Sequence, residues 1–431
     1  MAAEPHQPQP GAARAASVAR GDALPDSARW VVIGGGAVGL GVAYSLAVAG
    51  ETDVVVIECQ SELALATTSQ GAGLAGQLRT SLERTQLAMH SVATFRELEA
   101  AGGVRPAWRE VGSLRIALSE AVAASFGPLV AIARQAGLVV ERISAEEVRR
   151  RWPALDVNNI RSALWCPTDG YMHPPSVAAA YADAARRLGV RIVTSTRVEG
   201  IALDAGRVAA VETDRGRVAC QYAVNAAGAH AYHVARLVGL ELPIVPVRHE
   251  YFVSVPIAGL HAALPCFRIP DLGLYGRAAD AALLLGGWER TSLDADPRAY
   301  SLAAPAPPIT PDDAVLTSFE ERFAPLLPAV RGVARARIAK GWPTFTPDGG
   351  FLIGECRPVP GFVMAGGCNA HGISGSGGIG RLLVESLQAE HPSPHALSQS
   401  PNRFLDTPWD WESARRQARR VYETYYDVAS C

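Results

Sequence analysis

The feature that most constrains the fold is a glycine-rich turn between two apolar stretches, within residues 29–58, RWVVIGGGAVGLGVAYSLAVAGETDVVVIE. An apolar strand enters the turn, a helix of small residues follows, and a second apolar strand ends in Glu58, the β-α-β pattern of a dinucleotide-binding fold. Gly34 permits the tight turn, Gly36 lets the backbone approach a pyrophosphate, and Gly39 lets helix and strand pack closely. Glu58 lies nineteen positions after Gly39, where its carboxylate is expected to accept the ribose hydroxyls. This segment predicts an α/β chain that binds a dinucleotide.

Length and composition narrow the class of protein. A chain of 431 residues with 48% hydrophobic content is expected to form two interlocked domains. A formal net charge of -2 gives no general electrostatic reason to bind nucleic acid or an anionic membrane, so a small molecule is the expected partner. The seven cysteines are odd in number and lack CxxC spacing, which favours reduced thiols, a cytoplasmic location and no metal site. No apolar run reaches the ~20 residues of a membrane-spanning helix.

Further segments indicate how the domains are divided. Residues 1–28, rich in Ala, Pro, Gln and Gly, are expected to be a disordered leader. Helical periodicity covers 83–101, 119–137 and 175–189. The stretches YAVNAAG and GFVMAGGCNAHGISGSGGIG again join an apolar strand to a glycine-rich turn, so the nucleotide-binding domain is predicted to be discontinuous. The predicted division is a nucleotide-binding domain (29–100, 145–240, 340–395), a β-rich second domain (101–144, 241–339) and a C-terminal helical tail (396–431).

This layout resembles the FAD-dependent D-amino acid oxidase superfamily, and within it the flavin domain of dimethylglycine and sarcosine dehydrogenases. The resemblance implies a Rossmann-like FAD-binding domain interlocked with a β-sheet-rich substrate domain, of the D-amino acid oxidase or glutathione-reductase-like type. Beyond the first turn, it rests on TTSQGAGLAGQLR, DGYMHPPSVAAAYADAARRLGVRI, VRHEYFVSVPI, GWPTFTPDGGFLIGE, AGGCNAHGISGSGGIG and the tail NRFLDTPWDWESARRQARRVYETYYD.

The resemblance also implies the residues that hold FAD. They are Gly34, Gly36, Gly39, Glu58, Thr68, Ser69, Gln70, Gly71, Leu74, Val198 through its backbone at the adenine, Gly228, and Gly372, Ile373 and Ser374 around the pyrimidine. Several related dehydrogenases attach FAD through a histidine where this chain has Gln70. Monomeric sarcosine oxidases use a cysteine where it has Gly341. Non-covalent FAD is therefore predicted.

Candidate catalytic residues lie on two predicted strands and one glycine-rich turn. His249 and Tyr251 alternate with Arg248 and Glu250, so they share one strand face, which the resemblance identifies as the substrate side. They are either a proton acceptor with its partner or an ordinary cross-strand pair in the sheet.

Two further candidates come from the neighbouring segments. Tyr275, on the next strand, either closes the pocket or is a sheet tyrosine. His371 precedes a turn whose following helix is expected to face the flavin, although it could serve only to support that turn.

Two more candidates come from IAKGWPTFTPDGG, which contains the only lysine in the chain. The resemblance brings this loop to the flavin, so Lys340 could stabilise negative charge on the reduced ring or act as a base. Alternatively, it is a strand-edge residue with its amine in water. Trp342 lies where related oxidases place a carboxylate-binding arginine, which argues against an ordinary α-amino acid substrate. Its indole could instead face a methylated ammonium or fill the core.

These residues predict an FAD-dependent oxidation of the C–N bond in a secondary or tertiary amine, N-methylated or bulky, to an imine that water splits. Leu284 replaces a lysine that promotes oxygen reduction in sarcosine oxidases, which favours a protein or quinone acceptor over O2. The alternatives are a flavin subunit of a heteromeric amine, opine or D-amino acid oxidase, a biosynthetic tailoring oxidase acting on a non-amine, a flavin-binding scaffold without turnover, and a nicotinamide enzyme. Either a homo-oligomer or a hetero-oligomer is compatible with the sequence.

Overall fold

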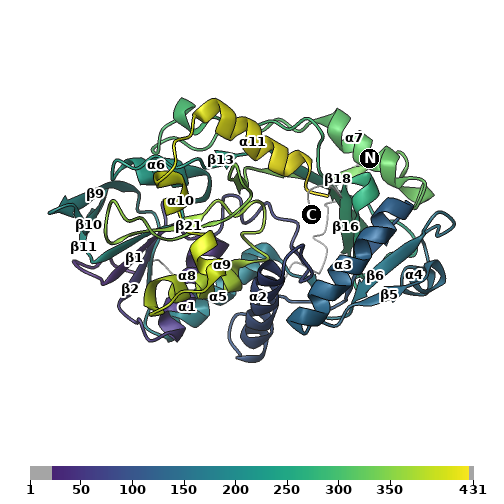
Figure 1. The fold of residues 1–431 in the computed structure, drawn as a ribbon, viewed down its shortest axis with the longest axis horizontal. Helices are drawn as coiled ribbons and strands as arrows, with labels where there is room; N and C mark the ends of the chain where they lie inside the picture. Colours follow the sequence, from purple (N-terminus) through teal and green to yellow (C-terminus); the bar gives the residue numbers. More distant parts are fainter. Residues whose placement is uncertain (1–21, 427–431) are drawn as a thin grey trace, which may run out of the picture.

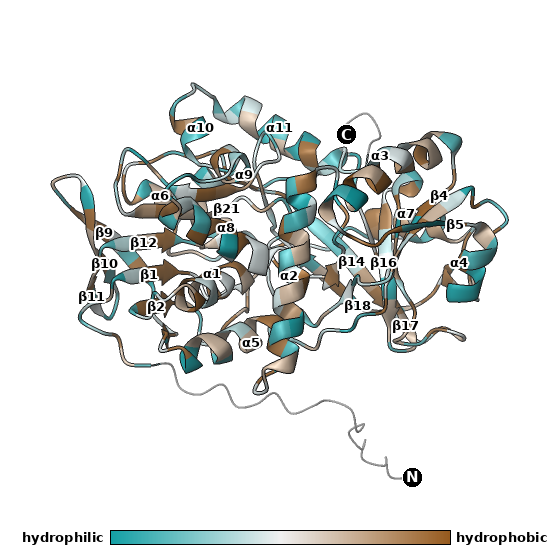
Figure 2. Ribbon diagram, turned by 60° about the horizontal axis from the view of Figure 1, so that its bottom comes forward, coloured by the Kyte–Doolittle hydropathy of each residue, from teal (hydrophilic) through white to brown (hydrophobic). Residues whose placement is uncertain are grey.

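Two large sheets organise the computed structural model, which describes residues 22–426 (Figure 1). The first has six strands in the order β20-β21-β12-β1-β2-β8, and all neighbours run parallel except β20 and β21. Its strands are β1 (Trp30–Ile33), β2 (Val54–Ile57), β8 (Arg191–Val193), β12 (Tyr222–Asn225), β20 (Leu352–Glu355) and β21 (Phe362–Gly366). Strands β1 and β2 are buried throughout, as expected for parallel strands covered on both faces. Figure 2 accordingly shows β1 and β12 in brown.

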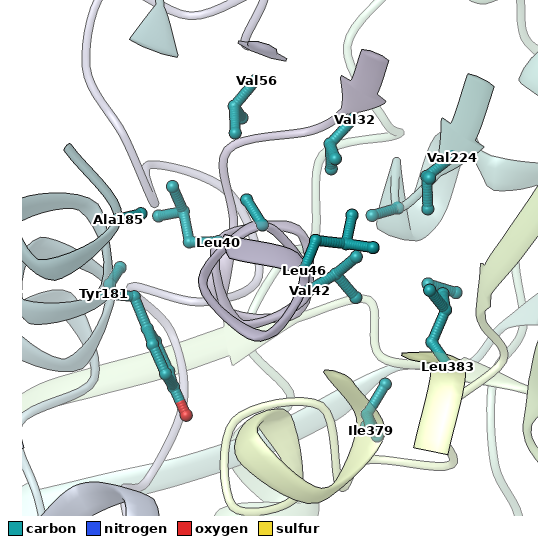
Figure 3. Close-up of a cluster of buried hydrophobic side chains, with 14 of the residues drawn as sticks. Val32, Leu40, Val42, Leu46, Val56, Tyr181, Ala185, Val224, Ile379 and Leu383 are labelled. Carbon is teal, nitrogen blue, oxygen red and sulfur yellow. The ribbon is translucent and has the colours of Figure 1, made fainter. Parts of the chain in front are cut away.

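One face of this sheet is covered by helices, and the other by a small sheet and a short helix. The helices are α1 (Ala37–Val48), α2 (Leu82–Ala100), α5 (Pro174–Arg187) and α8 (Ser376–Gln388). Helix α1 lies at the centre of the helical layer, with its side chains between the strands and the neighbouring helices (Figure 3). The contacts labelled there join Leu40, Val42 and Leu46 of α1 to Val32, Val56 and Val224 of the sheet, Tyr181 and Ala185 of α5, and Ile379 and Leu383 of α8. The second core contains β9 (Val198–Asp204), β10 (Arg207–Thr213), β11 (Gly216–Ala219) and α6 (Ala231–Arg236).

The second large sheet has eight strands in the order β18-β14-β17-β16-β15-β4-β6-β5. Neighbours run antiparallel except β15 and β4. The strands are β4 (Ser113–Ala117), β5 (Glu141–Ile143), β6 (Ser162–Cys166), β14 (His249–Ser254), β15 (Cys266–Ile269), β16 (Leu274–Ala279), β17 (Ala282–Gly287) and β18 (Arg335–Gly341). One face packs Phe252, Phe267 and Leu285 against α4 (Ala145–Arg151) and α7 (Asp313–Phe323), while α3 (Glu120–Ala136) packs near β4 and β6. Because side chains alternate along each strand, the opposite face is left for polar groups.

The C-terminal tail extends between the two sheets. It contains α9 (Pro394–Ser398), α10 (Asn402–Leu405) and α11 (Trp411–Glu423), and α11 runs along the top of Figure 1. The Asp410 side chain caps α11 by accepting a hydrogen bond from the N–H of Ser413. Ala414, Ala418 and Tyr422, spaced four residues apart, form its buried face. They pack against the short sheet of β13 (Val245–Pro246) and β19 (Thr344–Phe345).

The predicted α/β class is confirmed, and α2, α3 and α5 correspond to the three predicted helices within two residues at each end. Two details differ from the sequence-based expectation. Residues 22–28 are not a free leader, because Ser27 bridges Ala219 and Ala28 is 3% exposed; residues 1–21 lie outside the described part. Strand β6 falls in the predicted nucleotide-binding stretch 145–240 but pairs with β4 and β5 in the eight-stranded sheet, since hydrophobic pattern does not specify a strand's partner. Of the predicted tail, residues 427–431 also lie outside the description.

Within residues 22–426, no helix is long and apolar enough to cross a bilayer. The six cysteines in this range are all free.

Candidate active site

The glycine-rich turn lies at the carboxyl ends of β1 and β2, where α1 begins. Gly34 has φ +118°, which residues with a side chain rarely adopt, and a Cβ there would overlap the carbonyl oxygen of Ala226. The N–H of Gly35 donates a 2.7 Å hydrogen bond to Glu58 Oε2, which fixes the predicted ribose acceptor beside the turn. Gly36 is the N-cap of α1 and brings no side chain to this helix end. A pyrophosphate can therefore approach the backbone.

The predicted flavin segment 67–79 lies against this turn. Thr68 Oγ1 accepts a 3.1 Å hydrogen bond from the N–H of Ala37 at the start of α1. Gly71 lies against Ile373, so closely that a Cβ on Gly71 would overlap the isoleucine side chain. Segments 300 residues apart in sequence therefore form one surface beside the dinucleotide turn.

The other predicted cofactor residues surround the same end of the six-stranded sheet. Gly39 lies in α1, Ser69 in the turn before β3 (Leu74–Ala75), Leu74 and Val198 at the starts of β3 and β9, Gly228 in a 3-10 turn after β12, and Gly372 and Ser374 before α8. The N–H of Thr196 donates to the carbonyl of Glu58, which brings the chain leading into β9 beside the carboxylate. The turn, helix N-terminus and buried carboxylate fit the pyrophosphate and ribose of FAD.

Gln70 and Gly341, the two positions considered from the sequence for covalent attachment of FAD, are adjacent in space. Gln70 Oε1 lies so close to Gly341 that a Cβ there would overlap it. A carboxamide and a glycine offer no nucleophile, so this region is compatible with the predicted non-covalent FAD.

On the eight-stranded sheet, His249 and Tyr251 of β14 and Tyr275 of β16 share one face. Tyr251 and Tyr275 both pair with Gly286 of the strand between them, so their side chains point the same way. A side chain at Gly286 would overlap both tyrosines. Glycine at this position thus leaves room for the two rings.

His249 is hydrogen-bonded through both ring nitrogens. Nε2 lies 2.6 Å from the Tyr275 hydroxyl, and Nδ1 lies 3.0 Å from the hydroxyl of Tyr422 in α11. Burial lowers the pKa of His249 to about 4 and raises the pKa of Tyr275 well above its usual 10. Both side chains are therefore neutral at pH 7, and a neutral imidazole can accept a proton.

Tyr251 connects this face to the flavin segment. Its hydroxyl donates a 3.0 Å hydrogen bond to the carbonyl of Gly71. Burial raises the pKa of Tyr251, opposed by the positive charge of Arg337. The phenol is thus a neutral donor that orients the substrate side against the flavin segment.

Arginines occupy the rest of this sheet face. Arg268 lies directly opposite Tyr275 in the strand register, and Arg277 and Arg337 belong to the adjacent row. The carboxylate of Asp169, beside Arg268 at a small cavity, already accepts hydrogen bonds from Gln77 and Ser113.

Arg79, at the end of the flavin segment, adds a further cation near this cavity. Within residues 22–426, neither Arg79 nor Arg268 forms an ion pair. The face therefore carries positive charge that an anionic substrate group could neutralise.

Tyrosines at the end of the tail complete the site, and sequence reasoning missed them. Tyr425 stacks on Trp288 with ring centres 4.0 Å apart, and its hydroxyl lies 2.8 Å from His371 Nε2. Burial, with Arg79 and Arg84 nearby, lowers the pKa of His371 well below 6.5. The spacing of Ala414, Ala418 and Tyr422 was the available signal that this helix buries one face.

The side chains of Lys340 and Trp342 have other surroundings. Lys340 pairs with Glu250, so it shares the sheet face opposite to His249 and Tyr251. Trp342 is 8% exposed and donates its indole N–H to the carbonyl of Pro307 at 2.7 Å. The structure thus brings together His249, Tyr251, Tyr275 and His371. Lys340 lies on the other sheet face, whereas the carbonyl of Trp342 accepts a 3.4 Å hydrogen bond from Thr67 of the flavin segment.

Several curated proteins are similar to this chain in sequence. Human sarcosine dehydrogenase is 32% identical over 94% of this chain and 44% of its own length. The 4-methylaminobutanoate oxidase (formaldehyde-forming) of Paenarthrobacter nicotinovorans is 29% identical over 89% and 46%. The regulatory subunit of mouse pyruvate dehydrogenase phosphatase is 29% identical over 94% and 46%. The chain thus spans less than half the length of these relatives.

Solved structures with the same fold align with this chain over nearly their whole length. L-proline dehydrogenase from P. horikoshii superposes with a TM-score of 0.80 at 23% identity, covering 89% of this chain and 99% of the other. Glycine oxidase from Geobacillus kaustophilus gives a TM-score of 0.73 at 23% identity, covering 88% and 99%. The family model for FAD dependent oxidoreductases (DAO) matches residues 29–386. The chain therefore belongs to the family of FAD dependent oxidoreductases, with FAD as its cofactor.

Proposed function

We propose that this protein oxidises the C–N bond of a secondary or tertiary amine to an imine, which water then hydrolyses. FAD, when bound, supplies the acceptor for the hydrogen and two electrons of the C–H bond. The observation that carries the proposal is the hydrogen-bonded pair of the half-buried His249 and the buried Tyr275, on the sheet face that meets the flavin segment. Removal of a hydride requires the nitrogen lone pair, so the site must accept a proton from an ammonium substrate.

The pair is suited to that task. Tyr275 can accept the proton from the substrate nitrogen while its own hydroxyl proton passes to His249 Nε2, 2.6 Å away. The lowered pKa of the imidazole keeps this nitrogen unprotonated at pH 7. No charge has to remain on the phenol, because one proton arrives as another leaves.

The arginines favour an amine that also bears an anionic group. Arg268, opposite Tyr275, is near enough for one molecule to reach both side chains, since directly paired residues in a sheet have Cβ atoms about 5 Å apart. The named substrates of the dehydrogenase and oxidase relatives, sarcosine and 4-methylaminobutanoate, combine an N-methyl amine with a carboxylate. We therefore propose N-alkyl amino acids rather than uncharged amines.

One residue of the same sheet face bears on the choice of electron acceptor. Leu284, directly opposite Arg277, is 1% exposed and packs with Tyr251 and Tyr275. Leu284 stands where the resemblance to sarcosine oxidases expects the lysine that promotes oxygen reduction, so this chain lacks that particular ammonium group. We propose a protein or quinone acceptor in preference to O2.

The test is anaerobic reduction of the FAD-loaded protein by sarcosine, dimethylglycine, 4-methylaminobutanoate and the uncharged amine N-methylbutylamine. Bleaching of the flavin band by a carboxylate-bearing amine, but not by N-methylbutylamine, is expected. Readmission of air should restore the band only slowly. Bleaching by dithionite alone would reject amine oxidation.

A second candidate is a flavin-binding scaffold without turnover. Similarity to the phosphatase regulatory subunit favours it, because that protein's name describes regulation. A scaffold predicts stable FAD binding without reduction by any amine in the panel.

A further inference from the structure

A chain of four side chains runs from the proposed substrate site to a buried carboxylate. Tyr275 bonds to His249 Nε2 at 2.6 Å, and His249 Nδ1 bonds to Tyr422 at 3.0 Å. The Tyr422 hydroxyl lies 3.4 Å from Glu289 Oε1, while Glu289 Oε2 accepts a 2.6 Å hydrogen bond from Arg248. The C-terminal helix thus supplies the link between the histidine and the carboxylate.

Donor and acceptor roles along the chain are determined from its carboxylate end. Glu289 pairs with Arg248 and can only accept when ionised, so the single hydroxyl proton of Tyr422 points toward it. The Tyr422 oxygen must then accept the proton on His249 Nδ1. That leaves Nε2 with its lone pair, and Tyr275 donates to it. The remaining lone pairs of Tyr275 are free to accept a proton from the substrate.

We infer that Tyr422 is a positioning residue that holds His249 in the Nδ1–H tautomer and connects it to Glu289 as the terminal proton acceptor. The inference rests on the proposed amine oxidation and adds to it a residue from the C-terminal helix. The histidine nitrogen that faces Tyr275 thereby keeps its lone pair free to accept a proton before substrate arrives.

The proton transfer balances without another reactant. The substrate nitrogen loses one proton to Tyr275, and Tyr275 passes its own to His249 Nε2. His249 passes its Nδ1 proton to Tyr422, and Tyr422 passes its own to Glu289. Glu289 becomes neutral, the other three side chains end neutral, and His249 ends as the opposite tautomer. Burial raises the pKa of Glu289, despite the opposing effect of Arg248, so this carboxylate is a better acceptor than an exposed one.

Packing keeps the chain away from solvent. Tyr422 is fully buried, with its ring against Trp288 and Phe345. The other titratable and charged groups around the chain are Arg248 before β14, Glu250 and Tyr251 on β14, Arg268 on β15, Asp312 before α7, and Tyr426 in the tail. Because these groups remain in place in a Tyr422→Phe variant, a change in pH dependence would report the lost hydroxyl.

The experiment compares the FAD-loaded full chain with Tyr422→Phe and with a matched control, Tyr232→Phe. Tyr232 also packs against α11, edge-on to Trp411 at 5.1 Å, and its hydroxyl also reaches a carboxylate, Glu241 Oε1 at 3.5 Å. Its removal tests the loss of a tyrosine hydroxyl at the same helix, away from His249. Two readouts are taken: ¹⁵N NMR of labelled histidines for the tautomer of His249, and the pH profile of anaerobic flavin reduction by sarcosine.

In the wild type and in Tyr232→Phe we expect the Nδ1–H tautomer. In Tyr422→Phe we expect it to be lost, reduction at pH 7 to slow about tenfold, and the rising limb of the pH profile to shift up by about one unit toward the substrate's own pKa. If Tyr422→Phe retains the tautomer, or retains the wild-type pH profile at equal FAD content, the inference is wrong.

The two readouts also separate this inference from the proposed function. If the wild type is reduced by no amine, the proposed function fails, while the histidine tautomer still tests the role of Tyr422. Should Tyr422→Phe fail to fold, Glu289→Gln removes the terminal acceptor and leaves the tyrosine in place. It is expected to give the same upward pH shift, and an unshifted profile would overturn the inference.

Discussion

The two large sheets hold their functional groups by different means. At the six-stranded sheet, the groups that fit FAD are mainly backbone: a glycine turn, a helix N-terminus and one carboxylate fixed by the N–H of Gly35. At the eight-stranded sheet they are side chains, brought together from β14, β15, β16 and the C-terminal helix. The first arrangement is sensitive mainly to added side-chain atoms. The second is sensitive mainly to the loss of side-chain atoms, and it also requires glycine at position 286.

The largest effect is expected on the side-chain-based site. Tyr275→Phe keeps the ring and removes the hydroxyl that meets His249, so amine-driven flavin reduction should fall about 10³-fold, or about 4 kcal/mol. FAD content should remain that of the wild type, because the hydroxyl does not reach the six-stranded sheet, and the melting temperature should fall only slightly, since one hydrogen bond of His249 is lost at a cost of about 1 kcal/mol. Stopped-flow spectroscopy measures the rate of flavin reduction, absorbance measures the FAD content, and calorimetry measures the melting temperature. A reduction rate within threefold of wild type would remove Tyr275 from the mechanism.

Adding one methyl group should break the backbone-based site. Gly34→Ala must adopt φ +118° with its Cβ against the Ala226 carbonyl, at an expected cost of about 3 kcal/mol of unfolding free energy and with loss of FAD. Gly127→Ala is the control, since Gly127 lies in α3 with no atom within 4 Å of the added carbon. That variant should be stabilised by about 0.5 kcal/mol. Urea unfolding measures the stability of both variants. Equal losses of unfolding free energy in the two variants would contradict the comparison.

The same contrast explains what the sequence could predict. The cofactor side is encoded locally: the glycines, the small-residue helix and Glu58 occur within thirty residues, so their spacing alone predicts their meeting. On the substrate side, alternation along β14 correctly placed His249 and Tyr251 on one face. It could not show that Gly286 separates the two tyrosines, because register depends on strands that are distant in sequence.

Two other residues show where sequence reasoning reached its limit. Lys340 is the only lysine of the chain and was a candidate for that reason. It pairs with Glu250, the residue after His249, so its side chain lies on the face opposite His249. Tyr422 lies 173 positions after His249, and no local pattern connects them. Ala414 and Ala418, two turns and one turn earlier, indicate that Tyr422 is buried on α11, but they do not indicate which residue it contacts.

Acid pH should destabilise the substrate side through His249. Burial lowers its pKa to about 4 from an unfolded value near 6.5, so between these values the unfolded chain binds a proton that the folded chain does not. The contribution of His249 to the free energy of unfolding is thus fully present above pH 6.5, and the free energy falls by up to about 3 kcal/mol as the pH drops to 4. His249→Gln lacks this contribution, so urea unfolding from pH 7.5 to pH 4.5 should show a smaller loss for the variant. Parallel curves for the two proteins would mean that His249 is solvated.

A smaller effect is expected from one of the arginines. Arg268→Gln keeps much of the side chain but removes the charge opposite Tyr275, so the dissociation constant of a carboxylate-bearing amine should rise about 30-fold, or about 2 kcal/mol. Binding of an uncharged amine should change little. Arg207→Gln, at an exposed position in β10, is the control. A uniform loss for charged and uncharged ligands would assign Arg268 to packing rather than to anion binding.

The smallest effect is expected where the cofactor side does use a side chain. Thr68→Val removes the hydroxyl that accepts from the N–H of Ala37 but preserves shape, so it should cost about 1 kcal/mol and weaken FAD binding about fivefold. The glycine turn and the N-terminus of α1 remain, and these carry most of the expected affinity for a pyrophosphate. Equilibrium titration of the apoprotein with FAD measures the change. A loss of 100-fold would show that this site also depends on individual side chains, and the contrast between the two sheets would no longer hold.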